Sequence, residues 1–241
     1  MRRPGWCPRP AARAMLLASA LGLATASAQA QQVLLQTNVA NDTVPARTGP
    51  NRRYFGHVLA GYAPVVDGSD LGVAYGPLSA EWLLGGRLKR RLSGGLAVCT
   101  DLRYSYLRYN LTPGVTRPAP FLNNPEASQH LGFHQLQGEL SLRLNPGRRR
   151  GNVVGRYVDA LAYGGWAFAT TYATEQPASG GRQEVVAHQP HYLARWLGGV
   201  GLRAGSNSLA LVGRYRLSPA FTDPALPELP RLTIGVEFGW F

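Results

Sequence analysis

The stretch LTIGVEFGWF, residues 232–241, places an apolar residue at every even position from Leu232 to Trp240. Small or polar residues stand between them, and one more aromatic residue, Phe241, follows. Alternation with a period of two is typical of a β-strand that has one apolar face and one polar face. The fold therefore depends on which of the two faces points outward.

The same alternation recurs in seven earlier segments, which we expect to be strands: 54–62, 78–88, 96–109, 129–144, 153–172, 191–203 and 208–217. All five acidic residues in the eight segments lie on the parity opposite to the apolar residues, and so do most of the arginines. The exceptions lie toward segment ends: Arg108, Arg156, His130 and His134. This separation predicts eight strands, each with a charged face and an apolar face.

The connections between these segments alternate in length. Long links cover 63–77, 110–128, 173–190 and 218–230, and shorter links cover 89–95, 145–152 and 204–207. Outer-membrane barrels have an even number of antiparallel strands, long extracellular loops and short periplasmic turns. The pattern predicts an all-β fold, an eight-stranded antiparallel up-and-down transmembrane β-barrel that covers residues 53–241.

The first thirty residues have the composition of an export signal. Four arginines precede an apolar run over residues 14–26, and Ala28-Gln29-Ala30 supplies a cleavage site. We therefore expect a signal peptide over 1–30, a periplasmic leader over 31–52, and a location in the bacterial outer membrane. Cleavage lowers the formal charge from +12 to +8 and removes Cys7, so Cys99 alone remains and no intramolecular disulfide forms. The basic residues are scattered, which argues against nucleic-acid binding.

This pattern, with its terminal Phe241, resembles the small eight-stranded outer-membrane barrels of the OmpA/OmpX kind, and within them the PorT-like barrels of Bacteroidota. The resemblance covers about residues 54–241 and implies outer-membrane lipid and the barrel-insertion machinery as partners. One feature departs from that family. Gly239 and Glu237 occupy the alternate positions, counted back from the final aromatic, where the family has hydrophobic residues. The register of the last strand therefore stays open.

The interior of an eight-stranded barrel is just wide enough for side chains to fill it. Buried charges persist when they are paired, so we expect a closed ion-pair network in the lumen rather than a conducting pore. Its expected members are Glu81, Asp101, Arg103, Glu139, Arg143, Asp159, Arg195, Arg214, Arg216 and Glu237. Aromatic residues near segment ends predict girdles at the two membrane interfaces: Tyr54, Tyr62, Tyr104, Tyr106, Tyr192, Tyr215, Trp240 and Phe241.

The function that this pattern favours is that of a structural or interaction protein, not an enzyme, with no cofactor and no metal site. The loop 110–128, which holds four prolines, is the best candidate contact surface for an extracellular or secretion-system protein. One alternative is a lipid-modifying outer-membrane hydrolase that would use Ser128, His130 and His134, or His188 and His191, although no carboxylate partner is evident. A second alternative is a soluble lipocalin-like barrel, in which the apolar face would point inward.

Overall fold

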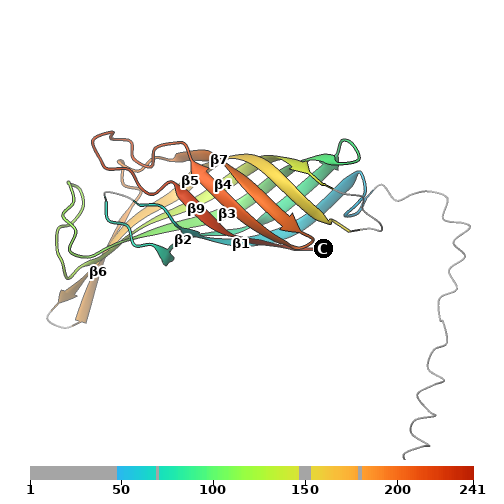
Figure 1. The fold of residues 1–241 in the computed structure, drawn as a ribbon. Coiled ribbons are helices and arrows are strands. Elements are labelled where there is room, and N and C mark those ends of the chain that lie inside the picture. Colours follow the sequence, from blue (N-terminus) through green and yellow to red (C-terminus); the bar gives the residue numbers. More distant parts are fainter. Residues whose placement is uncertain (1–47, 69–70, 147–152, 179–180) are drawn as a thin grey trace, which may run out of the picture. The chain divides into compact units, whose positions relative to one another are not determined.

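The computed structural model describes residues 48–68, 71–146, 153–178 and 181–241, and the predicted signal peptide and residues 31–47 of the predicted leader lie outside these ranges. The described residues form one compact unit, an all-β barrel (Figure 1). Within these ranges, no helix is long and apolar enough to cross a membrane.

Eight strands close into a ring in which every neighbouring pair is antiparallel. The ring runs β1, β2, β3, β4, β5, β7, β8, β9, and β9 pairs back onto β1. The predicted eight-stranded antiparallel barrel is therefore confirmed. The strands are β1 (Tyr54–Val65), β2 (Gly76–Arg91), β3 (Leu96–Leu111), β4 (Ser128–Leu144), β5 (Arg156–Ala178), β7 (Trp196–Ser206), β8 (Leu209–Arg216) and β9 (Leu232–Trp240).

A ninth strand, β6 (Gly181–His188), lies outside the ring and corrects the prediction of a loop over 173–190. It pairs with the second half of β5, from Thr171 opposite His188 to Ala178 opposite Gly181. A β-bulge precedes this extension, because Gln135 and His134 of β4 pair with Ala167 and Ala169 and leave Phe168 as an extra residue. The extra residue reverses the phase of β5, so the period of two continues with its faces exchanged.

Alternation along each strand places apolar side chains outside the barrel and charged side chains inside it. Leu140 and Trp196 are 59% and 72% exposed, whereas Glu139 and Arg214 are 3% and 1% exposed. The soluble lipocalin-like alternative requires the opposite orientation, so the structure contradicts it. Closure of the sheet gives each of the eight ring strands, over the residues that the structure describes, a partner strand on both sides.

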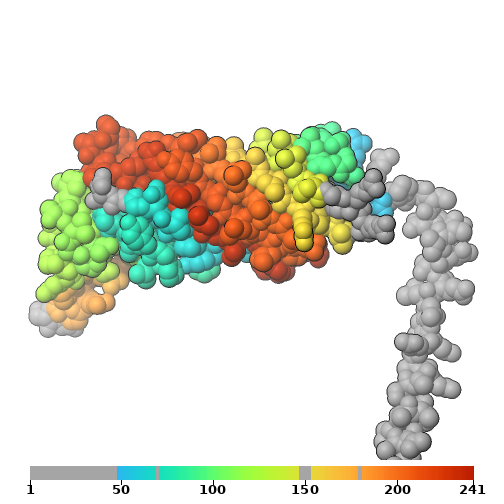
Figure 2. All heavy atoms as spheres, in the orientation of Figure 1, coloured from blue at the N-terminus to red at the C-terminus, as the bar shows by residue number. Residues whose placement is uncertain are grey.

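The two ends of the barrel differ. At one end lie the connections 66–75, 112–127 and 217–231 together with the β5–β6 hairpin, and we call this the long-loop end (Figure 1). At the other, the short-turn end, a two-residue turn of Asn207 and Ser208 joins β7 to β8. Asn207 has a φ of 51°, the backbone conformation that such tight hairpins require. Figure 2 shows one side of the barrel as a closed surface between these ends.

Candidate functional site: a filled lumen and a capped mouth

A cluster of ten charged side chains fills the central section of the lumen, and we call it the charge layer. Every barrel strand except β1 contributes to it, and all ten residues are buried. Its five arginines balance its five acids, so its formal charge is zero: Arg87, Arg103, Arg143, Arg203 and Arg214 with Glu81, Asp101, Glu139, Asp159 and Glu237.

Two of the pairs in the charge layer are bidentate and join neighbouring strands. Arg87 of β2 lies opposite Asp101 of β3, and its Nε and Nη2 donate to the two carboxylate oxygens at 2.8 and 2.7 Å. Arg143 of β4 lies opposite Asp159 of β5, with both distances 2.8 Å. Bidentate arginine–carboxylate pairs fix geometry as well as charge, so they hold adjacent strands in register.

Glu139 and Glu237 connect strands across the lumen. Glu139 accepts from Arg103 and from Nη2 of Arg203 at 2.5 Å. Glu237, on the last strand, accepts from Nη2 of Arg214 at 2.5 Å and from Nη2 of Arg87 at 3.0 Å. Because each carboxylate is shared by several arginines, the charge layer is one connected network that closes the middle of the barrel.

Glu81 ends the charge layer on the side toward the long loops. Its carboxylate accepts from Ser105 Oγ at 2.6 Å and from Gln137 Nε2 at 3.0 Å, and it lies 3.4 Å from Arg214 Nη1. A void of about 20 Å³ lies beside it, which is room for about one water molecule. The described lumen is therefore packed with side chains, as its eight-stranded circumference predicts.

Two residues that we expected in the network lie elsewhere. Arg195 is exposed in a turn before β7, which begins only at Trp196, so the alternation of the strand does not extend to it. Arg216 is buried but forms a separate pair with Glu228 of the loop 217–231, at 3.0 Å. Conversely, Arg87 and Arg203 are central members of the charge layer, although neither is among its expected members. Both lie at the charged positions of their alternating segments, and this pattern predicts that they point into the lumen.

An apolar cap occupies the lumen between the charge layer and the long-loop end, where we expected a polar interior. The strands supply part of this cap, the long loops supply Leu71, Val73, Phe121, Ala220, Phe221 and Leu229, and the link before β7 supplies Leu193. The Phe121 ring makes edge contacts with Tyr172 at 5.7 Å and Phe221 at 6.0 Å. The strand members are Val65, Leu107, Tyr109, Leu111, Leu131, Phe133, Ala167 and Leu197.

Arg117 ties two of the long loops together within this cap. Its guanidinium donates to the carbonyl oxygens of Leu71 at 2.7 Å and Thr112 at 2.6 Å, and more weakly to Gly72 and Val115. Burial lowers the pKa of this guanidinium. The carbonyl oxygens satisfy a buried charge without a carboxylate, so residues 71–75 and 112–127 are held together over the mouth.

Aromatic side chains form a band on the outer face toward the long-loop end. Register places Tyr62, Trp82, Tyr106 and His134 in one row across β1 to β4. A second row joins Tyr104 to Trp166 and Trp196 through Leu136. Tyr215 lies exposed on β8 near the same end, and Tyr54 and Trp240 lie exposed toward the short-turn end.

Two residues of the predicted girdles depart from the outer face. Tyr192 lies in a turn before β7 and packs against the apolar cap, with its ring 6.1 Å from that of Phe121, and burial raises its pKa to about 12. Phe241 follows β9, and its ring contacts Phe55 at 5.2 Å and His57 at 5.6 Å at the rim. Trp240, at the end of the last strand, therefore points outward, and Phe241, which follows that strand, lies at the rim of the barrel.

Ser128 lies opposite Glu175 in the sheet, but among the described residues none of the histidines weighed as catalytic candidates forms an ion pair with an acid. His134 Nδ1 is 2.6 Å from the hydroxyl of Tyr104, and its ring stacks on Tyr106 at 4.5 Å. His130 lies opposite Asn110 and Ala173 in the sheet. Among the described residues, neither histidine pairs with a carboxylate, and no cluster of three metal-ligating side chains occurs. Tyr104, Tyr106 and His134 together form an aromatic contact surface.

No protein-family model and no curated protein matches the chain. Among solved structures, it is similar to Ail, the attachment invasion locus protein of Yersinia pestis, with 11% identity and a TM-score of 0.39. It is also similar to the N-terminal β-barrel domain of Pseudomonas aeruginosa OprF, with 10% identity and a TM-score of 0.27. Each likeness covers 77% of this chain and 97% of the other. At these values the likeness says nothing about activity or ligand, and the resemblance to PorT-like barrels stays a prediction.

Proposed function

We propose that this chain is an integral outer-membrane β-barrel with a filled lumen, which acts as a structural or interaction protein through its long-loop end. The observation that carries the proposal is the orientation of the strands, with leucines and tryptophans outside and paired charges inside. Such a continuous apolar surface would drive aggregation in water. In lipid it is the stable arrangement, because a closed barrel satisfies all strand backbone groups internally.

The aromatic band supports the same proposal. Tyrosine and tryptophan place an apolar ring in lipid and a polar edge among headgroups, and they concentrate at membrane interfaces. β3, β4 and β5 have 16, 17 and 23 residues, more than the ~9 to 11 that cross the apolar layer. These strands therefore continue beyond the membrane and carry the capped mouth and the β5–β6 hairpin into solvent. The export signal predicted for residues 1–30 directs the chain to the cell envelope.

An interaction role fits the long-loop end better than transport does. The charge layer and the apolar cap both obstruct the lumen, whereas the clamped loops present a preformed surface on a rigid scaffold. The hairpin adds an exposed strand, β6, that pairs on one side only.

Membrane fractionation with gel migration tests the barrel. A folded membrane barrel remains compact in SDS until it is boiled, so we expect the unboiled protein from the outer-membrane fraction to migrate differently from the boiled protein. Recovery in the periplasmic fraction with identical migration would reject the proposal.

Protease access in intact cells tests the orientation. The Arg182 side chain in the hairpin is 78% exposed, so trypsin added outside should cut there. The matched site is Arg156, exposed at the short-turn end, which we expect to be cut only after the outer membrane is opened. The reverse order of cleavage would place the long loops in the periplasm.

A further inference from the structure

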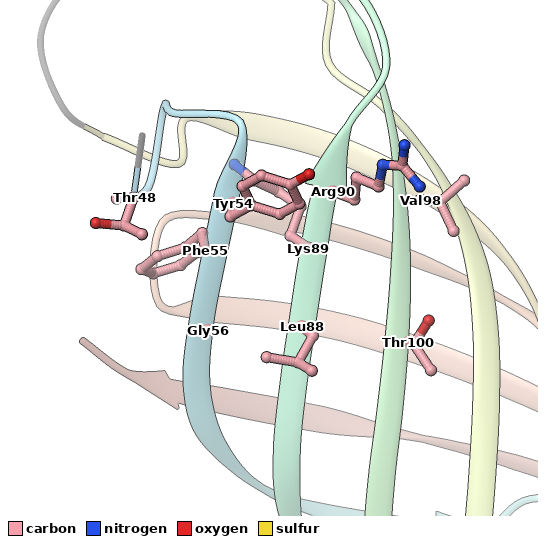
Figure 3. Close-up of a pocket in the computed structure, with 10 residues that line it drawn as sticks. Thr48, Tyr54, Phe55, Gly56, Leu88, Lys89, Arg90, Val98 and Thr100 are labelled. Carbon is pink, nitrogen blue, oxygen red and sulfur yellow. The ribbon is translucent and has the colours of Figure 1, made fainter. Parts of the chain in front are cut away.

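An open groove of about 830 Å³ lies on the outer face of the barrel at the short-turn end (Figure 3). Three neighbouring strands form its floor. Register places Arg90 between Tyr54 and Val98, and Leu88 between Gly56 and Thr100. Gly56 has no side chain, so the space above the floor stays open beside Leu88.

A turn over residues 48–53 makes one wall of the groove. Gly49 N donates to Tyr54 O at 2.8 Å, and Arg91 Nη1 donates to Asn51 O at 3.1 Å. The buried Lys89 also donates to the carbonyl oxygen of Pro50. These contacts fix the turn against the strands, so the groove is part of the folded barrel.

The charged side chains that the structure describes around this groove are all positive. Arg52 and Arg53 of the turn and Arg90 of the floor are exposed. The Arg53 guanidinium lies 5.7 Å from the centroid of the Tyr54 ring. The acidic residues that the structure describes lie either in the charge layer or toward the long-loop end, at Asp67, Glu126, Glu175, Glu184, Asp223 and Glu228. Arg90 therefore faces an apolar groove, and no acid of the described ranges lies near it on the outer face.

We propose that this groove binds an anionic phospholipid of the periplasmic leaflet. An acyl chain lies over Leu88, Val98 and Thr100, and the phosphate accepts hydrogen bonds from Arg90 at the rim, with Arg53 adding positive charge. Guanidinium groups bind phosphate with directed hydrogen bonds, and the fixed groove distinguishes a diacyl lipid from a free anion. The inference rests on the proposed function, because the groove faces lipid only in an inserted barrel.

Native mass spectrometry of the detergent-solubilised full barrel tests the site, with phosphatidylglycerol and phosphatidylcholine of matched acyl chains. We expect the wild type to bind phosphatidylglycerol more tightly. Arg90→Gln should weaken that binding about tenfold, the effect of losing one charge-assisted hydrogen bond. Arg195→Gln removes an exposed arginine at the opposite end and should leave the affinity unchanged.

A second variant separates the groove from its charge. Thr100→Trp fills the floor with an aromatic ring that the lipid-facing surface tolerates, so it should weaken phosphatidylglycerol binding while Arg90 stays in place. Unchanged binding in both variants would overturn the proposal, and so would displacement of the lipid by equimolar inorganic phosphate. If the wild type fails the gel-migration test, the proposed function fails. If it inserts but binds the two lipids equally, only the lipid site fails.

Discussion

Glu139→Gln is the substitution that most sharply tests the charge layer. The change keeps the shape of the side chain but leaves five arginines facing four acids. Glu139 accepts from Arg103 and Arg203, and its Oε2 lies 3.5 Å from Arg214. Glutamine accepts through a single oxygen, so its amide NH2 would face at least one arginine donor.

The expected loss follows from these contacts. Hydrogen bonds to charged groups contribute about 1.5–3 kcal/mol each, and Glu139→Gln removes about two of them. This agrees with the loss of about 3–5 kcal/mol that follows removal of one partner from a buried ion pair. We therefore expect the free energy of unfolding to fall by about 3–5 kcal/mol.

The assay is urea unfolding of the refolded barrel in lipid vesicles, followed by tryptophan fluorescence. The matched control is Glu175→Gln, which removes an exposed pair with Arg182 and should change stability by less than about 0.5 kcal/mol. The double variant Glu139→Gln/Arg103→Gln restores neutrality, so it should lose less than the sum of the two single variants, by about 1–3 kcal/mol. A Glu139→Gln barrel as stable as the wild type would refute the network.

Three further predictions concern the outer face, the lumen and the cap. Ala160→Arg places a charge on the outward face of β5 and should lower stability in vesicles by about 2–4 kcal/mol if the site lies near the bilayer midplane. Equal stability would contradict the orientation of that strand. Cys99 is fully buried, so a maleimide should label it only after unfolding in urea, and rapid labelling of the folded protein would show an open lumen. Arg117→Ala removes the guanidinium that donates to four loop carbonyl oxygens, so limited proteolysis should cut the loop 112–127 faster while the barrel retains its gel migration.

The barrel and its orientation are predictable from sequence because the signal is local. Each strand repeats its own alternation, and the charges at Glu81, Asp101 and Glu237 mark the inner parity without knowledge of any partner strand. Arg87 and Arg203 have the same mark, so their place in the charge layer follows from the rule that identified the others. The ion-pair partners are not predictable in this way, because the contact of Arg87 with Glu237 depends on the closure of β9 onto β1.

The apolar cap is not predictable in this way. Leu131 and Phe133 share their parity with Gln135 and Gln137, so alternation within β4 assigns them inside but does not say what they contact. Their contacts come from loops such as 112–127, whose Phe121 lies in a stretch without periodicity. The extra residue Phe168 also exchanges the inward and outward positions of β5 beyond the bulge. The alternation of β5 therefore does not reveal the extension that pairs with β6.

Fluorescence quenching in bilayers tests whether the apolar outer face meets lipid, because Trp82, Trp166, Trp196 and Trp240 all lie exposed on that face. We expect brominated phospholipids to quench the tryptophan fluorescence of the folded protein strongly in vesicles, and iodide in the aqueous phase to quench it weakly. Strong quenching by iodide with little effect of brominated lipid would show that this face meets water, and the barrel would then not be embedded in the membrane.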